Sequence, residues 1–170
     1  MEAGALSQWV FCAVAAALGL GLVLPILWFR LPAMADYPNH LARIHALLSL
    51  KHDPLLARYY AADWRILPNL AFDGIMLALA RAFGLFAAGK IFLVGTVLLL
   101  PAGTVALHRA LHRRWSVWPL AAALFAYDQN LAYGLLNYLF GTGLALVAAA
   151  LWIWRREAAW WRRALVSYLF

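Results

Sequence analysis

Residues 9–29 read WVFCAVAAALGLGLVLPILWF and contain no charged side chain. As an α-helix this stretch is roughly 30 Å long, which matches the hydrocarbon core of a bilayer. Trp9 and Trp28 stand near its two ends, where tryptophan anchors a span at the interface with water, and Pro25 is expected to bend the helix. The stretch therefore predicts a transmembrane helix and an all-α membrane fold.

The composition of the whole chain favours the same class of protein. Of the 170 residues, 66% are hydrophobic and 12% are charged, whereas about a quarter are charged in an ordinary soluble domain. The mean hydropathy is +0.77. A soluble domain of this size leaves about a third of its surface exposed, which is too much for so few polar residues to cover. We attribute the net charge of +7 to the loops of a membrane protein and expect no nucleic-acid partner.

Three further segments are predicted to cross the bilayer, at residues 90–108, 115–131 and 132–154. The first and third contain uncharged runs long enough for a span. The second is short, and it spans only if its end brings Asp128 close to a membrane surface, where a charged side chain is tolerated. Because residues 164–170 begin another apolar stretch, we interpret the chain as a single transmembrane domain of a polytopic helical bundle, truncated at its C-terminus.

Basic residues predict which side of the membrane each loop occupies. The loop around Asp128 has no Lys or Arg, whereas two arginine clusters follow the second and fourth predicted spans. The clusters are Arg109, Arg113 and Arg114, and then Arg155, Arg156, Arg162 and Arg163. Because Lys and Arg concentrate in cytoplasmic loops, both clusters are expected inside the cell and Asp128 outside.

The segment at residues 66–89, ILPNLAFDGIMLALARAFGLFAAG, decides the side of the loop before it. Asp73 and Arg81 divide it into apolar pieces far shorter than the roughly 18 residues of a span. A full span here would leave the preceding loop in the cytoplasm. A helix in the interface instead leaves residues 30–89 outside and the N-terminus inside, and we favour this arrangement. It predicts two amphipathic juxtamembrane helices in the first extracytoplasmic loop, at residues 36–50 and 67–84.

Rare polar residues gather directly after the first span, in the stretch MADYPNHLARIHALLSL at residues 34–50. Asp36, His40 and Arg43 have the spacing i, i+4, i+7, which places them on one stripe of a helix, beside an apolar stripe. An acid, an imidazole and a guanidinium then point the same way at the membrane surface. The alternative is structural, because an Asp shortly before Pro38 is also typical of a helix N-cap.

A second acid is predicted on the same side of the membrane. Asp128 stands in the short loop YDQNLAYG, and Tyr133 and Asn137 follow it one and two turns later, roughly on its face of a helix. An Asp that only caps a helix boundary is an equally good interpretation. Asp73 is a weaker candidate for a functional acid.

Several segments resemble the N-terminal module of the C-type (GT-C) membrane glycosyltransferases, and the resemblance in topology covers residues 9–170. The segments are ADYPNHLAR, ILPNL, HRALHRR, YDQN and GLLNYLFGTGLAL. The superfamily includes protein O-mannosyltransferases and the aminoarabinose transferases that act on lipid A. The resemblance implies a protein of the bacterial cytoplasmic (inner) membrane that transfers a sugar from a polyprenyl-phosphate donor to an acceptor on the extracytoplasmic face.

The resemblance also implies roles for the two acids. Asp36 is expected to be the catalytic base or a ligand of a divalent cation, either Mg²⁺ or Mn²⁺, and Asp128 a second acid. Helix geometry adds residues that are expected to contact the donor phosphate or the rest of the substrate. These substrate-binding candidates are His40, Arg43, Tyr133 and Asn137.

Two departures from the family pattern leave the metal requirement open. Many members carry two adjacent acids in the first loop, whereas residues 35–37 read ADY. The second juxtamembrane helix often begins His-Pro-Pro in the family, whereas residues 67–69 read LPN. Two other classes of function also stay open: a non-catalytic membrane subunit or scaffold, and a transporter component with polar residues lining a path through the spans.

Overall fold

The computed structural model describes residues 2–64 and 70–155. The elements in chain order are α1 (Glu2–Trp28), α2 (Tyr37–Ser49), α3 (Pro54–Tyr59), α4 (Leu70–Phe83), α5 (Leu85–His112), the 3-10 helix η1 (Trp118–Phe125), α6 (Gln129–Tyr133) and α7 (Leu136–Trp154). The described residues form helices and no strand, which confirms the all-α prediction. The predicted start of a span at residues 164–170 lies outside the described residues.

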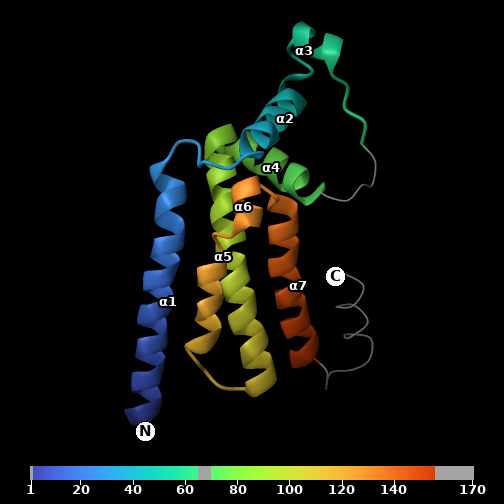
Figure 1. The fold of residues 1–170 in the computed structure, drawn as a ribbon. Coiled ribbons are helices and arrows are strands. Elements are labelled where there is room, and N and C mark those ends of the chain that lie inside the picture. The colour runs from blue at the N-terminus through green and yellow to red at the C-terminus, as the bar shows by residue number, and fades with distance from the viewer. Residues whose placement is uncertain (1, 65–69, 156–170) are drawn as a thin grey trace.

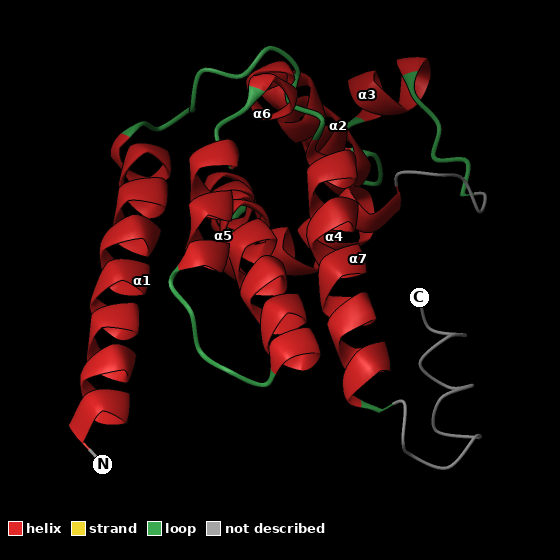
Figure 2. Ribbon diagram, turned by 60° about the horizontal axis from the view of Figure 1, so that its bottom comes forward, coloured by secondary structure: helices red, strands yellow, loops and turns green. Residues whose placement is uncertain are grey.

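Three helices are long and apolar enough to cross a membrane, judged by length and composition: Gln8–Trp28 within α1, all of α5 and all of α7. They lie side by side and match the predicted spans at 9–29, 90–108 and 132–154 (Figure 1). The short helices α2, α3, α4 and α6 gather at one end of the long ones, near the C-terminal end of α1 (Figures 1 and 2). The polar residues of α2 and α6 are therefore brought to the same end of the molecule.

Residues 115–131 differ from the single continuous helix that the sequence predicts. Trp118–Phe125 forms the 3-10 helix η1, with Pro119 in its first turn, and α6 follows after a short turn. The segment leads the chain from the C-terminal end of α5 back toward the N-terminal end of α7 (Figure 1). A 3-10 helix rises about 2.0 Å per residue against about 1.5 Å for an α-helix, so a short segment can make this long return.

The predicted helices at 36–50 and 67–84 correspond to α2 and α4, although residues 65–69 lie outside the described residues. Both helices pack on α5 through an apolar core in which Ile44, Phe72 and Met76 are fully buried. The apolar stripe of α2 thus faces the protein. A Cβ added to Gly89 of α5 would overlap the Tyr37 hydroxyl, so this glycine lets α2 lie directly on α5.

Two glycines allow α5 and α7 to approach each other closely. A Cβ on Gly143 of α7 would lie 2.6 Å from Leu99 Cγ of α5. A Cβ on Gly103 of α5 would lie 2.9 Å from the Gly143 carbonyl oxygen. Small residues of this kind let helix backbones pack tightly in a membrane, where dispersion contacts replace the hydrophobic effect as the main attraction between helices.

Candidate functional site where α2 meets α6

The connection from α1 to α2 is fixed on the C-terminal end of α6. The backbone N–H groups of Ala35 and Asp36 donate hydrogen bonds to the carbonyls of Ala132 (2.9 Å) and Tyr133 (3.2 Å). Gly134 ends α6 with φ of +84°, a left-handed conformation that glycine adopts at no steric cost. A Cβ on Gly134 would already lie 3.2 Å from the Asp36 Cβ. The backbone of α6 therefore sets the position of Asp36.

The Asp36 carboxylate does not cap its own helix. Asp36 occupies the N-cap position of α2 but makes no side-chain hydrogen bond to that helix's backbone. Asp53 and Asp128, which precede α3 and α6, do accept from backbone N–H groups. Asp36 instead accepts a hydrogen bond from Asn39 Nδ2 at 2.9 Å and leaves 49% of its side chain exposed. Asp36 therefore occupies the predicted N-cap position without the capping hydrogen bond, and its carboxylate is accessible.

His40 lies beneath this carboxylate. Its Nε2 is 3.2 Å from Asp36 Oδ2 and 3.1 Å from the Gly134 carbonyl oxygen, and the residue is 9% exposed. Its Nδ1 is 3.3 Å from Arg43 Nη2. A guanidinium only donates, so Nδ1 accepts and the ring proton is assigned to Nε2, which donates to the Gly134 carbonyl oxygen. The same nitrogen lies within ion-pair distance of Asp36, so the buried ring packs directly against the carboxylate.

Arg43 continues the network to α4. Its Nε and Nη2 donate to the same oxygen of Asp73, Oδ1, at 3.0 and 2.7 Å. The Asp73 side chain is 14% exposed and that of Arg43 is 47% exposed. The sequence favours Asp73 only weakly as a functional residue, because helix periodicity gives no sign of a partner on another helix. The one signal in the sequence was that Asp73 interrupts an otherwise apolar segment.

Two cavities flank the segment that carries Asp36. The larger has a volume of 670 Å³ and lies between α2, residues 60–64 and α4. Much of its lining is apolar, but it carries the charged or polar side chains Asn39, Arg43, His45, Asp63 and Asp73, so we call it the polar cavity. The smaller has a volume of 310 Å³ and an almost entirely apolar lining. Asp36 lines neither cavity; it stands between a segment that lines the apolar cavity, residues 31–34, and the helix that lines the polar one.

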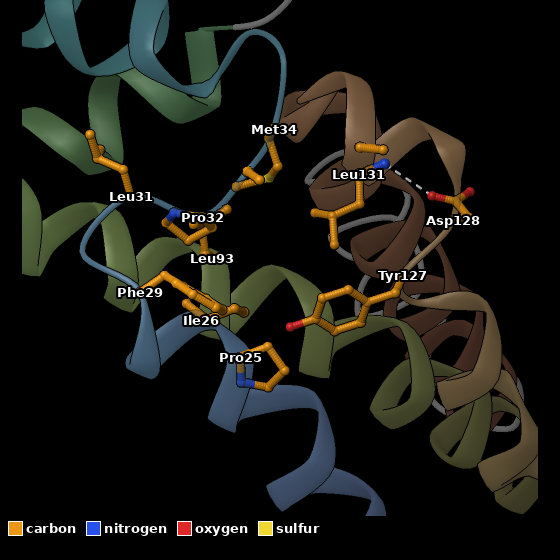
Figure 3. A pocket seen from close by; sticks show the side chains of 12 residues that line it. Pro25, Ile26, Phe29, Leu31, Pro32, Met34, Leu93, Tyr127, Asp128 and Leu131 are labelled. Atoms are coloured by element: carbon orange, nitrogen blue, oxygen red, sulfur yellow. Dashed lines mark hydrogen bonds between the residues drawn. The ribbon is translucent and has the colours of Figure 1, made fainter.

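The apolar cavity lies between the C-terminal end of α1, α5 and α6. Pro25 of α1 and Phe29 just after its end line it, and Tyr127 points into it from the opposite wall (Figure 3). The Tyr127 hydroxyl donates to the Leu22 carbonyl oxygen of α1 at 2.7 Å. This bond ties the return segment to α1 and closes one side of the cavity.

Asp128 reaches the rim of the apolar cavity but is engaged in local structure. Its Oδ1 accepts from the Leu131 N–H at 3.0 Å (Figure 3). Its Oδ2 accepts from Asn130 Nδ2 at 2.6 Å. It begins α6, whereas Asp36 contacts the end of α6. At about 1.5 Å of rise per residue, the two ends are on the order of 8 Å apart. The structure therefore brings both acids to one short helix without pairing them.

The remaining two candidates have structural partners. Asn137 Oδ1 accepts from the Phe72 N–H at 2.9 Å and so supports the first turn of α4. The Tyr133 hydroxyl accepts from Gln129 Nε2 at 3.1 Å, and its side chain is exposed. Tyr133 also contributes the carbonyl that binds the Asp36 N–H. Both residues thus help to build the site, and neither faces Asp36 with a free polar group.

The donor set does not fit a divalent cation. Within residues 2–64 and 70–155, no three His, Cys, Asp or Glu side chains gather as metal ligands. Asp36 faces N–H donors from Asn39 and His40, and such donors repel a cation. The implied metal-ligand role of Asp36 is therefore not supported, whereas a role as proton acceptor is compatible with its surroundings.

Comparison with known proteins supplies no family for this chain. No protein-family model matches it, and neither a curated protein nor a solved structure matches it significantly.

Proposed function

We propose that this chain belongs to an integral membrane glycosyltransferase that moves a sugar from a polyprenyl phosphate to an acceptor hydroxyl. The observation that carries the proposal is the state of Asp36. Its carboxylate is half exposed, free of any capping role and oriented by the buried His40. It stands between an apolar and a polar cavity, which suits a substrate with a lipid tail and a charged, hydroxylated head.

The arrangement of the helices supports an extracytoplasmic site. Arg113 ends α5 and Arg155 ends α7, at the end of the long helices away from α2 and α6 (Figure 1). If the basic end lies in the cytoplasm, as the positive-inside rule requires, Asp36 faces the outside of the bacterial cytoplasmic membrane. In the proposed polytopic bundle, α2 and α4 are then juxtamembrane helices.

The return segment fits this topology. In the proposed orientation, residues 115–128 re-enter at membrane depth as a 3-10 helix and a turn. Irregular backbone is tolerated at that depth where protein covers it, and η1 packs against α5 and α1. The span predicted at residues 115–131 is thus made by η1 and its flanking turns in this proposal, and not by a full α-helix.

The two cavities divide the proposed donor between them. The isoprenoid chain enters the apolar cavity at the end of α1, beside Phe29 and Leu31. The sugar and the phosphate occupy the polar cavity, where Arg43 and His45 line the wall. Arginine is suited to this task because its planar guanidinium binds phosphate oxygens in pairs.

The reaction follows from these positions. The acceptor hydroxyl loses its proton to the Asp36 carboxylate as its oxygen forms a bond to the anomeric carbon of the sugar. The bond from that carbon to the phosphate oxygen breaks, and the electron pair leaves with the polyprenyl phosphate. The His40 ring, whose Nε2 lies 3.2 Å from Asp36 Oδ2, helps to position the carboxylate, and Arg43 stabilises the charge on the departing phosphate.

A transporter is the less favoured alternative. Such a protein needs polar groups that line a path through its spans. The hydroxyls of Thr96 and Thr104 in α5 instead donate to carbonyls of their own helix, at Phe92 and Leu100. These bonds satisfy the two hydroxyls locally and leave the helix faces apolar.

The test uses membrane vesicles that contain the full chain and a radiolabelled polyprenyl-phosphate hexose. We expect Asp36→Asn to lower transfer of the label to vesicle acceptors by about 100-fold or more, as loss of a general base does, with donor binding retained. Asp53→Asn is the matched control, because the Asp53 carboxylate caps α3 and Asn can take over that cap. Full transfer by Asp36→Asn, or no transfer and no donor binding by the unaltered chain, would refute the proposal.

A further inference from the structure

The opposite end of the molecule holds a second group of polar residues with an unusual backbone conformation. Arg113, at the C-terminal end of α5, has φ of +54° and ψ of +22°, the only left-handed non-glycine residue among those that the structure describes. Helices that end in this conformation usually place Gly or Asn there, because a Cβ is disfavoured. Strain of this kind is found where a particular side chain is required, so the arginine calls for an explanation.

Arg113 lines a cavity of 300 Å³ together with Arg109 of α5 and Trp154 of α7. The cavity therefore lies where the C-terminal ends of these two helices meet. The guanidinium of Arg109 is ordered, since its Cζ lies 4.1 Å above the centre of the Trp115 ring. Trp115 packs in turn on Phe11 of α1, with ring centres 4.9 Å apart. Contacts with Trp115, and through it with α1, thus hold the Arg109 guanidinium in place beside Arg113.

Three arginines, Arg109, Arg113 and Arg114, stand close together at the C-terminal end of α5. No Asp or Glu occurs between Asp73 and Asp128 in the sequence, although Glu2 begins α1 at this end of the bundle (Figure 1). The rings of His108 and His112 lie 4.6 Å apart beside these arginines. Such a cluster favours an anionic ligand, and paired guanidinium groups are most complementary to phosphate.

We propose that Arg109, Arg113 and Trp154 form a binding site for the phosphate of an anionic phospholipid headgroup. α5 and α7 are both candidate spans, so their ends lie at the depth where headgroups are found. Tryptophan is enriched at that depth, and basic pockets between spans bind anionic headgroups there. The site is separate from Asp36, so it does not depend on the proposed sugar transfer. Free phosphate offers the same chemistry without the tails, and the test separates the two.

The experiment measures binding of phosphatidylglycerol and phosphatidylcholine to the purified full chain by native mass spectrometry from detergent. We expect phosphatidylglycerol to be retained over phosphatidylcholine, and inorganic phosphate to compete only weakly because it lacks the tails. Arg113→Gly should lower the affinity for phosphatidylglycerol by about fivefold, since each basic residue at a membrane surface contributes roughly that much. The same substitution should raise the thermal midpoint, because glycine relieves the left-handed strain.

Two further variants complete the test. Arg109 lies within the regular helix α5, and Arg109→Gln should also weaken phosphatidylglycerol binding. This variant tests the proposal even if Arg113→Gly fails to fold. Arg81→Gln removes the same charge from α4, at the other end of the bundle, and should leave binding unchanged. Equal retention of the two lipids, competition by phosphate as strong as by the lipid, or unaltered binding in both cavity variants would each overturn the proposal.

Discussion

Arg43 of α2 donates two hydrogen bonds to one carboxylate oxygen of Asp73 in α4, thirty positions further along the chain. The pair joins the two short helices beside the polar cavity, and through His40 it also reaches Asp36. The polar face of α2 is thus positioned by a contact with another helix.

The Arg43–Asp73 pair should make a measurable but modest contribution to stability. The Arg43 side chain is 47% exposed, so water and salt weaken the attraction, and we expect a coupling energy of about 0.5–1 kcal/mol. The measurement is a double-mutant cycle of Arg43→Gln and Asp73→Asn, with unfolding in mild detergent followed by circular dichroism. Strictly additive effects of the two substitutions would contradict the pairing.

His40 is predicted to act by orienting Asp36. His40→Gln places an amide N–H near the position of Nε2 and should retain most of the sugar-transfer rate. His40→Ala removes the donor and should lower that rate by about tenfold or more, as the loss of a positioning contact does. Donor affinity should stay unchanged in both variants, since the ring is buried away from the cavity. Equal loss of rate in the Gln and Ala variants would show that the polar contact of residue 40 with Asp36 does not control the rate.

Of the two neighbouring glycines Gly141 and Gly143 in α7, only Gly143 should be required for the contact with α5. Gly143→Ala forces a Cβ against Leu99, and we expect it to destabilise the protein by about 1–3 kcal/mol. Gly141→Ala is the matched control in the same helix, because nothing lies within 4 Å of a Cβ there. The control should be neutral or stabilising by about 0.5–1 kcal/mol, since Ala has the higher helix propensity. Thermal unfolding of the two variants in the same detergent decides the point.

Alkaline pH should destabilise the protein through Tyr37. Burial raises the pKa of the Tyr37 hydroxyl from 10.0 to about 12, because the phenolate loses its water in the contact with α5. The unfolded chain therefore releases this proton first. The resulting stabilisation is fully present below pH 10 and is lost as the pH rises from 10 to about 12.

The loss corresponds to at most about 2–3 kcal/mol. The measurement compares the free energy of unfolding at pH 9 and pH 11.5 in the unaltered chain and in Tyr37→Phe. The variant should lose less stability over this interval, since the other tyrosines titrate in both proteins. Parallel losses would show that Tyr37 ionises as freely in the folded protein as in the unfolded one.

The sequence predicts the long helices well because their signal is local. An uncharged run such as residues 9–29 satisfies its own backbone hydrogen bonds as a helix and can bury its whole surface in lipid. No partner segment is needed to make that inference, and α1, α5 and α7 follow it. The same reasoning did not predict the form of residues 115–131. Hydropathy does not distinguish an α-helix from a 3-10 helix, and the distance that this segment must cover depends on α5 and α7.

The sequence predicted the candidate site only in part, for the same reason. The spacing of Asp36, His40 and Arg43 places them on one face of α2, as expected. It does not reveal that His40 is buried against Gly134, or that Asp73 lies opposite Arg43. The three aspartates at N-cap positions look alike in sequence, yet only Asp53 and Asp128 cap their helices. Whether a carboxylate turns to its own backbone depends on which side chains the rest of the fold supplies.

By itself, the sequence determined that this protein is helical, that the runs at residues 9–29, 90–108 and 132–154 suit a membrane, and that Asp36, His40 and Arg43 stand together after the first of them. Those properties follow from hydropathy and from the 3.6-residue period, which act within a single helix. Only the tertiary structure decided that α6 holds Asp36, that His40 packs between Asp36 and Gly134, and that Arg113 lines a cavity at the other end. These contacts join residues far apart in the chain, and their geometry is fixed by the packing of whole helices.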